Sequence, residues 1–412
     1  MKKMFVISMF VLLVMSIAAM AQAGWVTTRL TTNSVSENIN NINAAGQSVW
    51  SDSGGSDGGS DTEIFYLDGT TVVQLTTNGA EDKAPQISAG GQVVWQGWDG
   101  SDYEIFYYNG SAVVQLTDNS DDDYAFQINA AGHVVWYARG GSDGGSDYEI
   151  FYYNGSTVSQ LTTNLGSDRS PQINDAGHVA WSGSDGVSYY DGSTVTQLTA
   201  NYVSYNTLRI SDVGHVVWKS SGKIYYYDGS TVTQLTANSD YVDYLQISFN
   251  GQIVWSAERG SDGGSDSEIF YYDGVTVKQL TTNAADDEYP KISAGGQVVW
   301  RAEDDGDYKL FYYDGMSVMR LADEYVGSRS YQISAGGQVV WSADDDSGDR
   351  DSEIHYYDGS TVVQVTNNSA HDSYPQITAD GQVYWLARGG SDGGTDYEVF
   401  RADFNDTCTD YD

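Results

Sequence analysis

Residues 85–117 read PQISAGGQVVWQGWDGSDYEIFYYNGSAVVQLT, a stretch with four short segments (PQIS, QVVW, EIFYY and AVVQLT) rich in β-forming residues. Proline is tolerated at the first residue of a strand, so Pro85 can open the first segment. Glycines separate the first two segments, and an acidic, glycine-rich loop leads to the third. Asn109-Gly110 indicates a type I′ hairpin turn before the fourth segment. The stretch therefore predicts a four-stranded antiparallel sheet.

The same unit recurs nine times along the chain, and one tryptophan marks each copy. The nine tryptophans are Trp50, Trp95, Trp136, Trp181, Trp218, Trp255, Trp300, Trp341 and Trp385. They lie 37 to 45 residues apart, a glycine precedes each by four residues, and all four prolines of the chain lie ten residues before a tryptophan. Bulky side chains occur on both sides of the third segment, as expected for a sheet that is packed between two neighbouring sheets. This period predicts an all-β fold, a single β-propeller of four-stranded blades.

The two ends of the chain predict how the ring closes. The ninth unit ends after its third segment and lacks the QLT strand, whereas Val26–Asn33 aligns with that strand of the other units. We expect the N-terminal strand to complete the last blade, which hides two sheet edges that would otherwise promote aggregation. Eight whole units and one composite unit favour nine blades, and an eight-bladed ring with one irregular unit is the alternative.

The unit resembles the TolB-type propeller repeat, with Pro-x-Ile-Ser, Gly-x-Val-x-Trp, Glu-Ile-Phe-Tyr, Asp-Gly and Gln-Leu-Thr in order. The resemblance is seen in Pro85–Thr117 and Pro290–Leu321 and covers nearly all of the chain after residue 24. The chain departs from the family in having Ala-Gly or Asp-Gly where the family usually has Pro-Asp-Gly. The resemblance implies a propeller with a habit of binding, and fold alone does not define function. Some TolB-like propellers resemble oligogalacturonate lyases with metal-bound histidines, which implies a polysaccharide lyase or hydrolase as an alternative.

The N-terminal segment is typical of an export signal. Lys2 and Lys3 precede an apolar run up to Met20, and Ala21-Gln22-Ala23 forms a small-x-small cleavage site. The alternative is an uncleaved membrane anchor, although the run is short for a bilayer span. We therefore expect a signal peptide at 1–23, a propeller at 24–403 and an acidic tail at 404–412, with a secreted or periplasmic product.

Charge and cysteine content exclude several classes of function. The chain has 57 acidic and 19 basic residues, a net charge of -38, so binding to nucleic acid or to an anionic membrane surface is disfavoured, and we expect no membrane insertion. The single cysteine, Cys408, has no internal disulfide partner. No nucleophile elbow, phosphate loop or metalloprotease motif occurs in the sequence, so we expect a non-enzymatic monomer.

Acidic loops predict one strongly negative face. In an up-and-down blade, the loops between the second and third strands share one end with the links between blades, and variable loops on a rigid scaffold often carry function. Three recurring acidic sets are candidate calcium ligands: Asp143, Asp147 and Glu149; Asp262, Asp266 and Glu268; Asp392, Asp396 and Glu398. Calcium prefers six to eight oxygen ligands, and glycines let such loops fold around it. The alternatives are solvated loops kept soluble by their charge, or loops that bind a cationic polymer.

Two further sets of residues are candidate sites. Trp98 falls outside the repeat phase, and an aromatic ring beside Asp99 could stack on a sugar. His133, His178 and His215 share one phase that glutamine occupies in other units, so hydrogen bonding is favoured over metal binding. The sequence thus predicts a non-enzymatic scaffold that binds a protein or polysaccharide, with a lyase or hydrolase and a structural cell-surface protein as alternatives.

Overall fold

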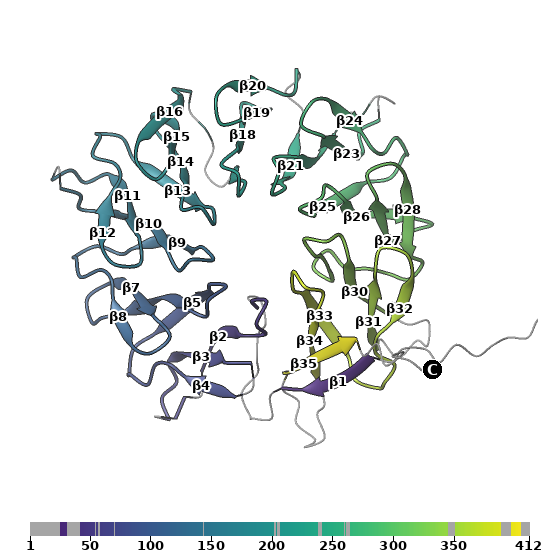
Figure 1. The fold of residues 1–412 in the computed structure, drawn as a ribbon, viewed down its shortest axis with the longest axis horizontal. Helices are drawn as coiled ribbons and strands as arrows, with labels where there is room; N and C mark the ends of the chain where they lie inside the picture. Colours follow the sequence, from purple (N-terminus) through teal and green to yellow (C-terminus); the bar gives the residue numbers. More distant parts are fainter. Residues whose placement is uncertain are drawn as a thin grey trace, which may run out of the picture.

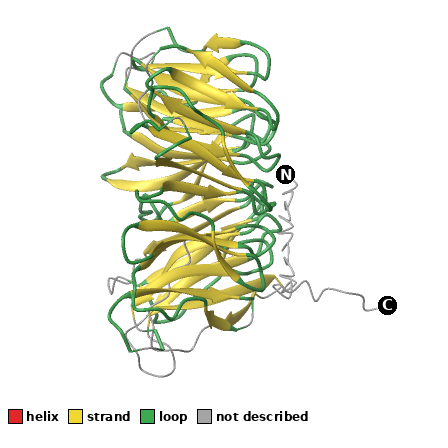
Figure 2. Cartoon of the chain, turned by 90° about the vertical axis from the view of Figure 1, so that its left-hand side faces the viewer, coloured by secondary structure: helices red, strands yellow, loops and turns green. Residues whose placement is uncertain are grey.

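The computed structural model describes most of the chain as an all-β protein without helices in the described part (Figures 1 and 2). The described residues are 25–30, 42–53, 55–56, 58–69, 71–142, 144–201, 203, 207–237, 241–258, 260, 264–344, 351–388 and 397–404. No helix among them has the length and apolar character needed to cross a bilayer. The expected signal peptide and Cys408 lie outside the described residues.

Nine antiparallel sheets follow one another around a common axis, and Figure 1 shows them in chain order around the ring. Blade 1 contains β2 (Ser48–Ser53), β3 (Thr62–Leu67) and β4 (Val72–Gln74), and blade 2 contains β5 (Asp82–Ile87), β6 (Val93–Trp98), β7 (Tyr103–Tyr108) and β8 (Val113–Gln115). Blade 3 contains β9 (Tyr124–Ile128), β10 (Val134–Arg139), β11 (Tyr148–Tyr153) and β12 (Val158–Gln160). Blade 4 contains β13 (Asp168–Ile173), β14 (Val179–Gly183), β15 (Gly186–Tyr190) and β16 (Val195–Thr199). Blade 5 contains β17 (Leu208–Ile210), β18 (Val216–Ser220), β19 (Lys223–Tyr227) and β20 (Val232–Gln234).

The second half of the ring repeats the same order. Blade 6 contains β21 (Val242–Ile247), β22 (Ile253–Glu258), β23 (Ser267–Tyr272) and β24 (Val277–Gln279). Blade 7 contains β25 (Asp287–Ile292), β26 (Val298–Asp304), β27 (Asp307–Tyr313) and β28 (Val318–Ala322). Blade 8 contains β29 (Tyr331–Ile333), β30 (Val339–Asp344), β31 (Ser352–Tyr357) and β32 (Val362–Gln364), and blade 9 contains β33 (Asp372–Ile377), β34 (Val383–Arg388), β35 (Tyr397–Phe404) and β1 (Trp25–Arg29). Among the described residues, blade 1 has a single bridge, between Ile42 and Ser48, in the place of a first strand.

The N-terminal strand closes the ring as the sequence predicts. β1 pairs antiparallel with β35, from Trp25 opposite Phe404 to Arg29 opposite Phe400, and the Leu30 amide donates to the Val399 carbonyl at 2.8 Å. Figure 1 shows the purple N-terminal strand beside the yellow C-terminal strand. The prediction of nine blades with a composite last blade is therefore confirmed.

The core lies between neighbouring blades. Each repeat tryptophan is almost fully buried, and Trp95 stacks on Phe106 of the adjacent strand with ring centroids 5.9 Å apart. Val49 and Ile64 of blade 1 pack in one cluster with Trp95 of blade 2. Because both faces of a blade are buried in this way, apolar and aromatic side chains occur on both sides of the strands, and Figure 2 shows the flat ring edge-on with loops at its two faces.

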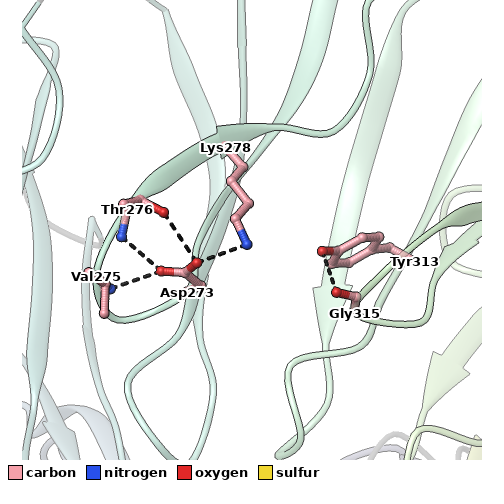
Figure 3. Close-up of polar contacts among 6 residues, drawn as sticks. All are labelled: Asp273, Val275, Thr276, Lys278, Tyr313 and Gly315. Carbon is pink, nitrogen blue, oxygen red and sulfur yellow. Dashed lines mark hydrogen bonds and ion pairs between the residues drawn. The ribbon is translucent and has the colours of Figure 1, made fainter.

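The Asx-Gly turns differ from the predicted type I′ geometry. At Asp273-Gly274 only the glycine has a positive φ, 97°, and the Asp273 amide closes a four-residue loop by donating to the Thr276 carbonyl. The Asp273 carboxylate accepts from the amides of Val275 and Thr276 at 2.9 and 2.8 Å and lies 2.8 Å from Lys278 Nζ (Figure 3). Lys278 and these amides hold the pKa of Asp273 below its ordinary value. The side chain organises the turn, so its own backbone needs no left-handed conformation.

Some of the first strands also begin earlier than predicted, whereas β17 and β29 begin at the predicted position. β5 starts at Asp82 rather than at Pro85, and its pairing with β6 shifts between Lys83 and Gln86. Ala84, in this β-bulge, has a φ of 53°. The bulge lets the strand continue past the proline, and this extension places a buried aspartate at the start of the strand.

Candidate functional site

The loops between second and third strands meet the links between blades at one end of the sheets, which we call the acidic loop face. A pocket of about 350 Å³ opens there between blades 2 and 3. Its lining residues are Ser101, Asp102, Ser120, Asp121, Asp122, Tyr124, Arg139 and Tyr148. The pocket therefore combines carboxylates, a guanidinium and two phenol rings from two blades.

Aromatic rings and cations are interleaved in this pocket. Tyr148 lies edge-on to Tyr124 with ring centroids 6.0 Å apart, and the guanidinium groups of Arg139 and Arg169 lie 4.7 and 4.2 Å from the Tyr148 ring centre. Burial, followed by the neighbouring Asp122 carboxylate, raises the pKa of Tyr124 to about 12, so its hydroxyl is a hydrogen-bond donor at neutral pH. The acidic loop face is thus not uniformly negative, because arginines are held over aromatic rings within it.

Trp98 is the last residue of β6 and not a loop residue, which corrects its sequence-based placement. Its side chain is 38% exposed and lies edge-on to Tyr103 at 5.2 Å. Lys83 Nζ lies 3.3 Å from the centre of the Tyr103 ring, and the Tyr103 hydroxyl donates to Glu81. Trp98 therefore belongs to a second aromatic group on the acidic loop face, on the other side of blade 2.

The predicted calcium ligands that the structure describes differ in how deeply they are buried. Asp143, Asp262, Asp392 and Asp396 lie outside the described residues. Asp147 and Asp266 are half-buried at the start of third strands. Glu149, Glu268 and Glu398 lie within the third strands β11, β23 and β35, as the sequence predicts, and at most 1% of each residue is exposed.

Between blades 2 and 3, the structure describes a set of buried acidic residues in full. These residues are Asp102, Glu104 and Asp123, which are 7%, 0% and 0% exposed. The Asn119 amide donates to Glu104 Oε1 at 2.8 Å, and Asn119 Nδ2 donates to Asp123 Oδ2 at 3.3 Å. The Ser101 hydroxyl donates to Asp102 Oδ1. The second oxygen of each carboxyl (Asp102 Oδ2, Glu104 Oε2 and Asp123 Oδ1) is buried without a hydrogen-bond partner among the described residues.

Burial shifts the titration of the first-strand aspartates. Burial, followed by Glu104, raises the pKa of Asp123 well above its ordinary value. Burial likewise raises the pKa values of Asp168, Asp287 and Asp372 to about 6. At Asp287, Trp300 Nε1 and Asn283 Nδ2 donate hydrogen bonds of 2.6 and 2.7 Å to the carboxyl.

Among the described residues, one group of three acidic side chains has ligand atoms close enough together to hold a metal ion. Asp99, Glu104 and Asp118 each place one oxygen within 4.8 Å of the others. This group was not among the predicted calcium ligands, because blade 2 lacks the Ser-Asp-Gly-Gly-Ser-Asp string on which that prediction rests. The sequence signal that could have identified this group is the spacing of Glu104 from Asp99 before it and Asp118 after it.

The three phase-matched histidines remain in separate blades. Tyr152 bonds His133 Nδ1 at 2.8 Å, and equivalent bonds join Tyr189 to His178 at 2.9 Å and Tyr226 to His215 at 2.7 Å. Burial lowers the pKa of His133 and His215. Each ring is thus engaged by a tyrosine of its own blade, in line with the predicted hydrogen-bonding role.

Comparisons with known proteins support the fold. No family model matches the chain, and no curated protein matches it. The dipeptidyl peptidase 4 of Porphyromonas gingivalis is 12% identical over 72% of this chain and 55% of its own, with a TM-score of 0.51. The propeller domain of the trilobed protease from Pyrococcus furiosus is 12% identical over 82% of this chain and 97% of its own, with a TM-score of 0.44. The tricorn protease is 13% identical over 87% of this chain and 47% of its own, with a TM-score of 0.34.

The nine sheets around a common axis define the chain as a β-propeller, and the similarity to the dipeptidyl peptidase agrees with part of this fold. At such identity the likeness concerns the fold alone. The chain spans about half the length of the dipeptidyl peptidase and of the tricorn protease. The TolB-type resemblance is not confirmed, because no family model matches.

Proposed function

We propose that this protein is a secreted or periplasmic scaffold, built from TolB-like repeats and without catalytic activity, that binds a glycan or protein through its acidic loop face. The observation that carries the proposal is the pocket between blades 2 and 3, where Tyr124 and Tyr148 stand beside carboxylates and Arg139. Ring faces contact the apolar face of a sugar, while carboxylates and guanidinium groups bond its hydroxyls. A polysaccharide is therefore the favoured ligand class.

Calcium is part of the proposal. The acidic sets containing Asp147, Glu149, Asp266 and Glu268 supply oxygen ligands of the kind calcium prefers, whereas Glu398 is already paired with Arg29. A bound ion would neutralise part of the net charge of -38 and hold the loops in one arrangement. Ligand binding is then expected to weaken when calcium is removed.

A glycan array probed with the full chain, in calcium and in chelator, tests this function. We expect binding of an oligosaccharide class in calcium, and at least a tenfold loss of affinity for Tyr148→Ala or Trp98→Ala, because an aromatic contact of this kind contributes about 1.4 kcal/mol. Met316→Ala is the control, since Met316 is 93% exposed on a turn at the opposite end of blade 7. Absence of binding to any glycan, or depolymerisation of polyuronates by the wild type, would contradict the proposal.

A further inference from the structure

The β-bulge in the first strand of a blade places one residue at positive φ, and the blades differ in which residue they use there. In three blades the residue is small, and in three others it is a tyrosine, although φ lies between 46° and 53° in all six. The residues are Ala84, Ala125 and Ser170 in blades 2, 3 and 4, and Tyr244, Tyr289 and Tyr374 in blades 6, 7 and 9. The bulge therefore forms with a small side chain, and its backbone does not require an aromatic residue.

The packing of the ring does not fully account for these tyrosines either. Tyr244 and Tyr374 are 39% and 46% exposed, so a large part of each ring remains outside the core. A positive φ is rare for a bulky residue, and backbone outliers of this kind gather at sites that hold ligands. An exposed aromatic ring on a strained backbone therefore points to contact with a ligand.

Two of the three tyrosines come together from neighbouring blades. The ring centroids of Tyr244 and Tyr289 are 4.1 Å apart, and their planes are inclined by 38°. Each is the third residue of its first strand, β21 or β25, and these strands begin at the acidic loop face. Figure 1 shows β21 and β25 at the inner edges of blades 6 and 7. The pair forms an aromatic surface with one ring from each blade, which we call the Tyr244–Tyr289 platform.

Charged groups beside the platform compensate each other. The Arg301 guanidinium lies 4.8 Å from the ring centre of Tyr289 and 4.0 Å from that of Tyr308. Arg301 Nη2 also lies 3.0 Å from Glu288 Oε2, on the neighbouring strand of the same blade. Because this cation already has its counter-charge, it does not require an anionic ligand, and a polyanion would be repelled by the net charge of -38. These charges favour a neutral ligand.

The combination of two phenol rings with a paired guanidinium and carboxylate matches the chemistry of a neutral sugar. A sugar ring has an apolar face of C–H groups, which packs on an aromatic ring, and hydroxyl groups at its edge, which bond to polar side chains. Figure 1 shows blades 6 and 7 on the far side of the ring from blades 2 and 3, which hold the pocket of the proposed function. Two separate sites on one face can contact different stretches of the same polymer.

We infer that the Tyr244–Tyr289 platform is a second binding site on the acidic loop face and that its ligand is a neutral polysaccharide. The inference rests on the proposed glycan binding and deepens it, because it names the class of polysaccharide and adds a contact site on blades 6 and 7. The two tyrosines contribute to binding of the polymer, and the strain at Tyr244 is retained because only a side chain at that position reaches the ring of Tyr289 from blade 6.

Affinity electrophoresis of the full chain, in native gels that contain a polysaccharide, tests the inference. The neutral probes are galactomannan and hydroxyethylcellulose, and the charged probes are polygalacturonate and glycol chitosan. We expect a neutral probe to retard the wild type, and Tyr244→Ala or Tyr289→Ala to weaken that affinity about tenfold, because each removes one aromatic contact. Val275→Ala is the control and should match the wild type, since Val275 is 84% exposed on the turn between β23 and β24, at the opposite end of blade 6.

Tyr244→Gly separates a role in binding from a role in packing. Glycine adopts the φ of 53° without strain, so this variant should lose affinity for the neutral probe while its melting temperature stays at or above that of the wild type. A lower melting temperature with unchanged retardation would assign the ring to packing between blades and overturn the inference.

The remaining outcomes separate this inference from the proposed function. If Tyr148→Ala weakens binding and neither Tyr244→Ala nor Tyr289→Ala does, the pocket between blades 2 and 3 stands and the platform fails. If the platform variants weaken binding and Tyr148→Ala does not, the platform stands and the pocket fails. A charged probe that binds more tightly than both neutral probes, with an affinity that falls in Tyr244→Ala, would overturn the ligand class. Absence of retardation by all four polymers would overturn the inference together with glycan binding, and would leave a protein as the ligand.

Discussion

Replacing Arg29 by methionine should destabilise the ring at its closure. Arg29 Nη2 lies 2.6 Å from Glu398 Oε1, and their side chains are 16% and 1% exposed. Methionine retains much of the side-chain volume but leaves the Glu398 carboxylate buried without its counter-charge. Removing one partner of a buried ion pair costs about 3–5 kcal/mol, because the remaining charge has lost its compensation. Because Arg29 lies on β1, this loss weakens the strand that completes blade 9.

Denaturant unfolding at neutral pH in chelator, followed by tryptophan fluorescence, measures this loss. Arg401→Met is the matched control, because the Arg401–Asp403 pair is 2.9 Å long but 29% and 39% exposed, and such pairs contribute at most about 1 kcal/mol. Adding Glu398→Gln to Arg29→Met should recover most of the stability, since it removes the uncompensated charge. The reasoning is refuted if Arg29→Met costs no more than Arg401→Met, or if the double variant is as unstable as the single one.

Two further predictions concern pH and packing. In chelator, the free energy of unfolding should fall as pH rises from about 4 through 6, because the folded state holds protons on buried first-strand aspartates whose pKa values are raised. Replacing these aspartates with asparagine should reduce the pH dependence of the free energy of unfolding, as measured by denaturant unfolding at several pH values. These aspartates are Asp168, Asp287 and Asp372. Gly251→Ala should cost about 1–3 kcal/mol more than Gly110→Ala in thermal unfolding: both glycines have positive φ, but a Cβ at Gly251 would collide with His215, whereas the space at Gly110 is open. Equal losses for the two variants would exclude that collision as the cause.

The recurring spacing of tryptophan, glycine and proline predicted the blade and favoured nine blades over eight, and the alignment of Val26–Asn33 with the fourth strands predicted the closing strand. These features depend on local residue propensities and on a sequence pattern that recurs in every unit. The turn type was predicted wrongly, because the Asp273 side chain accepts amide hydrogen bonds and this removes the need for a second left-handed residue. The β-bulge at Ala84 was also missed, since a bulge changes the pairing register without altering composition.

The candidate site was predicted only in its general region. The acidic strings predict calcium ligands, and this stays a prediction; the strings alone could not show how deeply each carboxylate is buried. Glu149 and Glu268 are fully buried in the third strands β11 and β23. The sequence did not predict that Asp82 begins the first strand β5, because the β-bulge extends this strand before Pro85.

The amino-acid sequence by itself determined the blade and the closed ring, because both follow from period, turn residues and the complementary ends of the chain. The tertiary structure alone decided which carboxylates face each other. Side chains such as Glu104 and Asp123 belong to different blades, and their burial depends on how one sheet packs against the next. The interaction energy between two such carboxylates depends on the distance between them and on the exclusion of water, and neither is encoded in any single repeat.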